Sequence, residues 1–145
     1  MIKLLAALAI LIASSAHATD SSFRDAVNSH LGAIDSRSTA AFEATLTNGP
    51  VLTFVALNGR VTRDKEAFRA QMRAWFKDQD WSWSRRELSL STTGGTGVAI
   101  LHIDYSDKDA NGSPYLLSYV LTLVFAKEGG SWRLIHDQNT RISPN

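Results

Sequence analysis

The stretch of residues 132–140, close to the C-terminus, constrains the fold more than any other part of the sequence. Its first half, Trp-Arg-Leu-Ile, has the aromatic and β-branched character of a strand, and its second half is the polar row His-Asp-Gln-Asn. A Gly-Gly pair precedes it, after the strongly apolar run 118–125, and this arrangement predicts a β-hairpin. Polar side chains on a strand that crosses the core are costly unless they are hydrogen-bonded or line a cavity. The sequence therefore predicts a fold that contains a pocket.

The N-terminus has the features of an export signal. Lys3 supplies a charged region, residues 4–13 an apolar region, and Ala16-His17-Ala18 an A-x-A cleavage site. The apolar run is shorter than the roughly 20 residues of a transmembrane helix, and there is no cysteine to carry a lipid anchor. We therefore expect a signal peptide at residues 1–18 and one mature domain at residues 19–145, periplasmic or secreted and without membrane contact after cleavage.

The composition excludes several classes of function. Lys and Arg number 15 against 14 Asp and Glu, and the two signs balance once Lys3 is removed, so no basic surface is expected to bind nucleic acid. The absence of cysteine excludes disulfides, thiolate nucleophiles and cysteine-based metal sites. No GxGxxG, P-loop or GxSxG motif supports hydride, phosphate or acyl transfer, and we expect no cofactor.

The spacing of apolar residues predicts an α+β fold. Helical periodicity occurs in three segments of the N-terminal half, at residues 23–34, 40–47 and 64–77. A short hairpin around Asn58-Gly59 separates the second helix from the third. Longer strands follow as an antiparallel meander, at residues 81–90, 98–105, 115–126 and the stretch from residue 132. A strongly curved antiparallel sheet, with the three helices closing its open side, would leave a cone-shaped pocket.

With these elements and motifs, the chain resembles the nuclear transport factor 2-like superfamily. Within this superfamily, the chain is similar to the SnoaL-like domains and to the association domain of calcium/calmodulin-dependent kinase. The resemblance spans residues 23–142 and rests on the element order, on Trp132-x-x-x-His136 and on the turn Gly112-x-Pro114. It implies a cone-shaped fold with a pocket, often dimeric. Members include isomerases, dehydratases, cyclases, epoxide hydrolases, binding proteins and assembly modules, so the resemblance implies a fold more firmly than a function.

The resemblance also suggests which side chains face the pocket. The kinase association domain has pocket arginines on its last three strands, and these places correspond here to His102, Leu123 and Asn139. A positively charged pocket is therefore not expected. The same alignment implies that Ile135, Asp137 and Asn139 face the cavity together with Leu123.

Asp137 is the foremost candidate for chemistry. A carboxylate that points into an apolar cone has a raised pKa and can act as a general base. The alternative is a buried ion pair with Arg133 or another arginine, since structural pairs also perturb pKa values. The superfamily's isomerases use a tyrosine on the first helix, where this chain has His30 and no tyrosine.

His102 and Asp104 are the second candidate pair, because they lie two residues apart on one strand face. They would form an acid–base pair or, alternatively, part of a solvated sheet surface. A metal site made of both with Asp137 has suitable ligand types but no spacing motif, so no metal is expected.

Aromatic side chains complete the predicted pocket. Trp81 and Trp83 alternate along a strand, so both indoles point to one face, where they would cap a flat ligand or seal the sheet edge. Trp75 on the third helix and Tyr119 on the apolar strand are the other aromatic residues expected to line the pocket.

These features favour an exported domain that binds a small, partly apolar molecule. The first alternative is a pocket isomerase, dehydratase or hydrolase with Asp137 as general base and His102 or Asn139 orienting the substrate. The second is a non-catalytic interaction module. In all cases a homodimer through the sheet is expected, since strand 115–126 is apolar on both faces. An open cavity with apolar walls would favour the binding protein. Convergence of Asp137, His102 and Asn139 on an open cavity would favour the enzyme, and a filled cavity would favour the interaction module.

Overall fold

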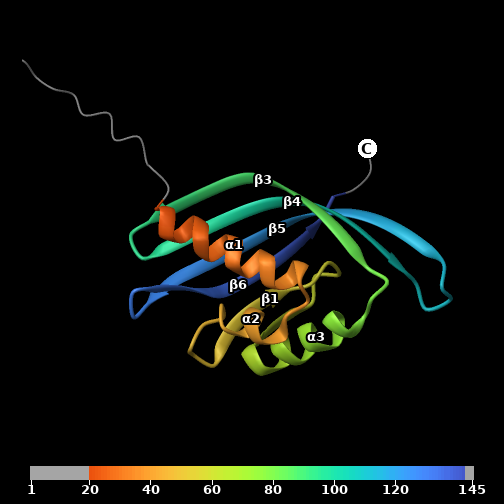
Figure 1. Cartoon of the computed structure of the whole chain (residues 1–145), viewed down its shortest axis with the longest axis horizontal. Coiled ribbons are helices and arrows are strands. Elements are labelled where there is room, and N and C mark those ends of the chain that lie inside the picture. Colours follow the sequence, from red (N-terminus) through yellow and green to blue (C-terminus); the bar gives the residue numbers. More distant parts are fainter. Residues whose placement is uncertain (1–19, 143–145) are drawn as a thin grey trace, which may run out of the picture.

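Three helices and a curved six-stranded sheet make up the computed structural model, which describes residues 20–142 (Figure 1). The elements are α1 (Ser21–Asp35), α2 (Thr39–Glu43), β1 (Val51–Val55), β2 (Val61–Asp64), α3 (Lys65–Lys77), β3 (Ser82–Thr93), β4 (Thr96–Lys108), β5 (Pro114–Glu128) and β6 (Ser131–Arg141). This order and the α+β class confirm the prediction. The predicted signal peptide, residues 1–18, lies outside the described residues. Within residues 20–142, no helix has the length and apolarity needed to cross a membrane.

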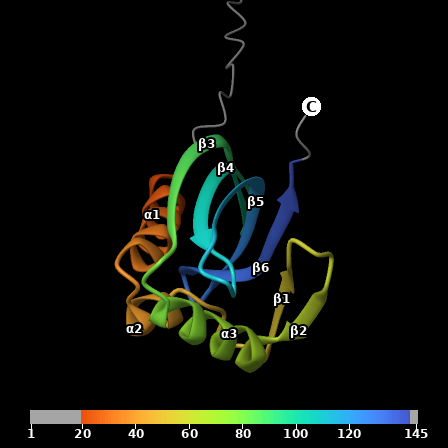
Figure 2. The same ribbon diagram turned by 90° about the vertical axis from the view of Figure 1, so that its right-hand side faces the viewer.

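The sheet has the strand order β2-β1-β6-β5-β4-β3. The four long strands form the predicted antiparallel meander, but β1 runs parallel to β6, with Phe54 paired to Asp137. The sheet is therefore mixed, and the short hairpin is attached to the last strand of the chain. Figure 2 shows the arched sheet with α3 lying across its open side. This arrangement places β6 near the middle of the sheet, between β5 of the meander and β1 of the hairpin.

Each helix is preceded by an N-cap residue whose side chain accepts a hydrogen bond from a backbone N–H of the first turn. This hydrogen bond stabilises the start of the helix. The acceptors are Asp20, Ser38 and Asp64. The second helix is shorter than the predicted segment 40–47, because the chain after it turns to pair with the sheet. Thr47 N donates to Leu134 O at 3.0 Å, and Leu134 N donates to Thr45 O at 2.8 Å. These hydrogen bonds with β6 replace those that would have continued α2.

The core fills the space between the helices and the inward face of the sheet. Its fully buried members come from α1, α2, α3 and the strands, and the largest are Phe23, Phe42, Phe68 and Phe125. His30 on α1 is also fully buried. Thr45 donates its hydroxyl hydrogen to Phe42 O at 2.6 Å, so His30 Nδ1 donates to Thr45 Oγ1 at 2.7 Å. His30 Nε2 has no hydrogen-bond partner within the described residues, and burial lowers the pKa of this imidazole to about 3.

A β-bulge in β6 decides which of its side chains face inward. Phe125 pairs with Leu134, whereas Val124 pairs with His136, so Ile135 is an extra residue between the two pairs. Leu134 before the bulge and Asp137 after it are both buried, although they lie three residues apart. The predicted inward position of Ile135 is therefore wrong, because simple alternation does not hold across a bulge.

Candidate functional site

A cavity of about 380 Å³ opens between α1, α3 and the inward face of the sheet. This volume lies within the range of small-molecule sites, roughly 300–1,000 Å³. Its walls are mainly apolar and aromatic, and include Ile34, Phe54, Met72, Leu117 and Leu121. Carboxyl and amide groups enter the lining at only four positions of the described chain, Asn58, Gln71, Asp137 and Asn139. The first two of these side chains are exposed at the rim.

Asp137 is the one carboxyl group that lines the cavity within residues 20–142. Its side chain is 6% exposed. Asn139 Nδ2 donates to Asp137 Oδ1 at 2.9 Å and is the only side-chain donor to this carboxyl among the described residues. Burial raises the pKa of Asp137 to about 7, and the Asn139 hydrogen bond partly opposes this rise.

The alternative of a buried ion pair with Arg133 is not what the structure contains. The Arg133 guanidinium donates to the backbone carbonyl of Ala44. No lysine, arginine or histidine of the described chain lines the cavity beside Asp137. Its carboxyl group is therefore buried without a cationic partner.

Asn139 is held in place by the parallel pairing of β1 with β6. Its side-chain nitrogen donates to Val55 O at 3.2 Å as well as to Asp137. On the neighbouring strand β5, Tyr119 is 7% exposed and also lines the cavity. Burial and the nearby Asp137 raise the pKa of the Tyr119 hydroxyl. Buried Asp137 and Tyr119 and half-buried Asn139 thus form the inner polar part of the cavity.

A hydrogen-bonded aromatic group forms one wall. Trp75 Nε1 donates to Tyr105 Oη at 3.1 Å, and the Tyr105 hydroxyl donates to Asp107 at 2.6 Å. Tyr115 also donates to Asp107, at 3.4 Å. Burial raises the pKa of Tyr105 and of Tyr115. Sequence reasoning did not name these two tyrosines as pocket residues, although Tyr105 alternates with buried Ile103 and Leu101 along β4.

The two tryptophans at the start of the meander have different surroundings. Trp83 lines the cavity, and its Nε1 donates to Asp35 at 2.8 Å. Trp81 is 3% exposed and lies outside the cavity lining. It stacks on Trp75 with ring centroids 4.2 Å apart and has the Arg37 guanidinium 4.0 Å from its ring centroid. Trp81 therefore supports the aromatic wall from behind.

His102 and Asp104 lie on the other face of the sheet. His102 Nε2 and Asp104 Oδ1 are 3.1 Å apart, and Asp104 also accepts from the Ser118 hydroxyl at 2.6 Å. The Ser118 hydrogen bond, followed by that of His102, lowers the pKa of Asp104. On this outer surface His102 is half-buried and Asp104 is exposed, so neither side chain reaches Asp137. Within residues 20–142, no group of three or more His, Asp or Glu side chains is placed to bind a metal ion.

The structure thus brings together part of the predicted pocket. Five predicted residues line the cavity, namely Trp75, Trp83, Tyr119, Asp137 and Asn139. Leu123 pairs with Asp137 across the strands but is fully buried in the core below the lining. The other predicted residues outside the lining are Trp81, His102, Asp104 and Ile135.

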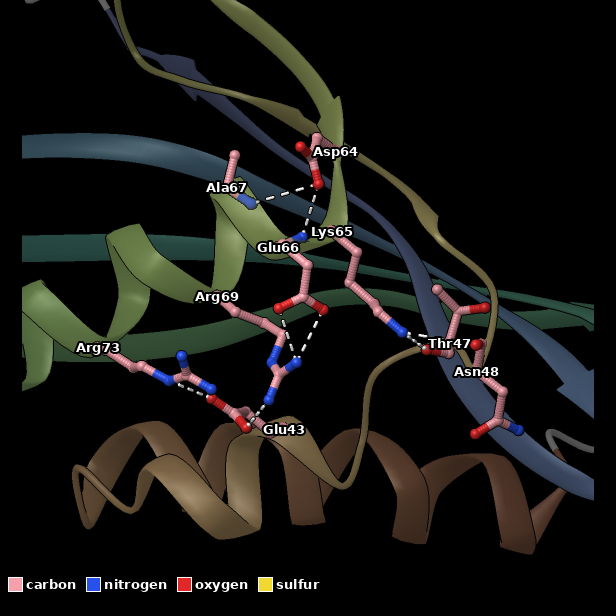
Figure 3. A network of polar contacts seen from close by, with 9 residues as sticks. All are labelled: Glu43, Thr47, Asn48, Asp64, Lys65, Glu66, Ala67, Arg69 and Arg73. Atoms are coloured by element: carbon pink, nitrogen blue, oxygen red, sulfur yellow. Dashed lines mark hydrogen bonds and ion pairs between the residues drawn. The ribbon is translucent and has the colours of Figure 1, made fainter.

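A second hollow, of about 480 Å³, lies where α2, α3 and β6 meet. The charged side chains that line it already have partners within the protein (Figure 3). Arg69 donates to Glu66 at 2.8 Å and also pairs with Glu43, which accepts from Arg73 at 2.6 Å. Lys65 Nζ donates to Thr47 O at 3.0 Å. This network joins α2 to α3 and leaves the first cavity as the better candidate site.

Solved structures with the same fold support this description. A candidate dehydratase of the NTF2-like family from Streptomyces avermitilis has a TM-score of 0.73 and 13% identity, with 86% of this chain and 97% of that chain covered. A ketosteroid isomerase-like protein from Erwinia carotovora atroseptica has a TM-score of 0.71 and 16% identity, with 86% of this chain and 96% of that chain covered. The S. rosetta CaMKII hub has a TM-score of 0.65 and 16% identity, with 84% of this chain and 95% of that chain covered. At these identities the likeness shows the fold alone.

The sequence itself matches one family. A comparison with curated proteins gave no match. Residues 24–139 match the family described as SnoaL-like domain. That segment includes the whole cavity lining, from Ile34 to Asn139. The chain therefore belongs to the SnoaL-like domain family.

Proposed function

We propose that this protein binds a small, partly apolar molecule in the cavity, with Asp137 and Asn139 as its polar anchors. The observation that carries the proposal is a buried carboxyl group, without a cationic partner among the described residues, in a cavity with mostly apolar walls. Burying such a group costs free energy unless it is paired or hydrogen-bonded. A bound molecule that pairs with the carboxyl group would recover part of this cost.

An enzyme is the second candidate, and the pKa of Asp137 favours it. A pKa of about 7 suits a general base near neutral pH. The similar structures include one described as a dehydratase candidate and one as ketosteroid isomerase-like. Against catalysis, His102 lies on the opposite face of the sheet and supplies no second acid–base group to the cavity. Binding therefore ranks first, with proton abstraction by Asp137 as the reaction to test.

Native mass spectrometry of protein purified from its own cell envelope tests the binding proposal. We expect an added mass of a few hundred daltons at most, because roughly 300–1,000 Å³ is the size range of small-molecule cavities. Ala56→Phe places a ring in the cavity lining and should remove the added mass, whereas Ala126→Phe on the outer face of β5 should keep it. The same protein is then screened by thermal melting against small apolar compounds.

The binding proposal fails if the wild type carries no added mass and no compound stabilises it more than it stabilises Ala56→Phe. Asp137→Asn then separates binding from catalysis. If the protein only binds, this change alters affinity. If it is an enzyme, the change abolishes turnover of an identified ligand and leaves binding largely intact.

We further propose that residues 1–18 direct export, on the basis of the Ala16-His17-Ala18 cleavage pattern. N-terminal sequencing of the protein recovered outside the cytoplasm should begin at Thr19. Recovery there of a chain that still begins at Met1 would contradict this proposal.

A further inference from the structure

The polar side chains of Asp137 and Asn139 offer the cavity hydrogen-bond acceptors that the protein does not use. The Asn139 side-chain nitrogen donates to Val55 O and to Asp137 Oδ1, so both of its hydrogens have partners. Within residues 20–142, neither Asp137 Oδ2 nor Asn139 Oδ1 receives a hydrogen bond from the protein. The two residues lie two positions apart on β6, on the same face. A ligand that satisfies both acceptors must supply at least two hydrogen-bond donors.

The charge of the lining is negative or zero, never positive. Asp137 is the only Asp or Glu, and no Lys, Arg or His is present among the described residues that line the cavity. The hydroxyls of Tyr105 and Tyr115 donate to Asp107, so their hydrogens are used within the protein. An anionic ligand would find no cation to pair with there. A cationic ligand would find one carboxylate and several aromatic rings.

Aromatic rings in the cavity wall would bind a cation together with the Asp137 carboxylate. Trp75, Tyr105 and Tyr119 line the cavity, and aromatic faces attract a cation within about 6 Å of the ring centre. Trp83 is left out of this set, because the Arg85 guanidinium already lies 5.5 Å from its ring centroid. The hydrogen bond from Trp75 to Tyr105 and the stacking on Trp81 hold the wall in place before any ligand binds.

We propose that the ligand is an organic amine, bound in its protonated form by Asp137 and Asn139, with its apolar body against the aromatic wall. This inference rests on the proposed binding function. A carbonyl compound is the main competitor, since it would accept a hydrogen bond from a protonated Asp137. A carbonyl oxygen has no donor for Asn139 Oδ1, whereas an ammonium group has three donors. The pair of acceptors therefore favours the amine.

The test uses matched probes that differ only in the polar group. Isothermal titration calorimetry compares 1-naphthylmethylamine, 1-naphthalenemethanol and 1-naphthoate, together with the corresponding benzyl compounds. At pH 8 we expect the amine to bind at least about tenfold more tightly than the alcohol, and the carboxylate not to bind. Asp137→Asn should remove the preference for the amine. Asp104→Asn, the same change on the outer face of the sheet, should leave it intact.

The pH dependence gives an independent readout. The amine stays protonated, so its affinity should rise roughly tenfold per pH unit from pH 5 up to the pKa of Asp137, about 7, with proton release in the calorimeter. The other titratable groups of the described lining are Tyr105, Tyr115 and Tyr119, whose pKa values are all raised, so they stay neutral in this range. A carbonyl ligand, which needs the protonated acid, would keep a nearly constant affinity below about pH 7 and lose affinity above it.

Any one of four results would overturn the inference. If the alcohol binds as tightly as the amine, or if amine affinity falls as the pH rises, the ligand is not an amine and the binding function stands. If Asp137→Asn keeps the preference for the amine, the cation is held elsewhere. If neither series binds below about 1 mM, the cavity does not accept small, partly apolar molecules, and the proposed function falls with the inference.

Discussion

Phe23 of α1 lies directly against Gly97 of β4. A Cβ atom on Gly97 would be 2.4 Å from Cε2 of Phe23, a distance that real Cβ contacts do not show. The Phe23 ring also meets Phe125, with centroids 5.6 Å apart, and Trp132, at 5.0 Å. The missing side chain at residue 97 therefore allows α1 to approach the sheet closely.

Gly97→Ala should destabilise the protein. The added methyl group must displace a fully buried ring, which costs about 1–3 kcal/mol in a well-packed core. Gly32→Ala is the matched control, because a Cβ there meets nothing within 4 Å on a helix. That change should raise the free energy of unfolding by about 0.5–1 kcal/mol. Urea denaturation of both variants checks the prediction, and equal stability of Gly97→Ala and wild type would contradict it.

His30 should make the protein less stable in acid. Below the usual histidine pKa of 6.5, the unfolded chain binds a proton that the folded chain, with its pKa of about 3, does not bind. The free energy of unfolding therefore falls by up to about 1.4 kcal/mol for each unit that the pH drops within this interval. His30→Leu should remove this dependence, and His102→Leu on the outer face should keep it. Denaturation curves at pH 4, 5 and 7 test the prediction, which fails if the His30→Leu and wild-type slopes agree.

Asp137 should have the opposite effect on stability. Between pH 3.8 and about 7, folded Asp137 keeps a proton that the unfolded chain has released, so stability falls as the pH rises through this range. The total loss is of the order of 4 kcal/mol. Asp137→Asn should therefore melt at a higher temperature than wild type at pH 8 and at a similar one at pH 4, with Asp104→Asn as control. A drop in stability of about 3–5 kcal/mol at pH 8 would instead mean that Asp137 holds a buried cation.

The protein should form a homodimer through the outer face of its sheet. Along β5, Tyr119, Leu121, Leu123 and Phe125 are buried toward the helices, whereas Val120 and Val124 remain half-exposed on the other face, as the alternation predicts. Beside them on β4, Val98 and Ile100 extend this apolar surface. Val120→Glu should weaken the dimer in light scattering, and Val61→Glu on the exposed β2 strand should not. A wild-type monomer at tens of micromolar, roughly the range of ordinary interfaces, would count against a dimer.

Periodicity predicted the elements and their order because it is a local property of the chain. The inward direction of Asp137 and Asn139 followed from the family resemblance, and the cavity lining contains both. The parallel pairing of β1 with β6 was not predicted, since it joins residues more than 80 positions apart, such as Phe54 and Asp137. The bulge at Ile135 was not predicted, because alternation assumes that inward-facing side chains recur at every second residue. The extra residue in β6 shifts this pattern by one position between Leu134 and Asp137.

That bulge has an evolutionary and an engineering consequence. Trp132 and Leu134 belong to the core, and Asp137 and Asn139 to the cavity, but the two pairs have opposite parity along a single strand. Removing one residue at Ile135 would restore regular pairing and force a choice between them, with either the core pair or the cavity pair turned to solvent. Substitutions within the cavity can therefore change its chemistry and leave the strand pairing intact, whereas a one-residue deletion in β6 would turn either the core pair or the cavity pair away from the helices.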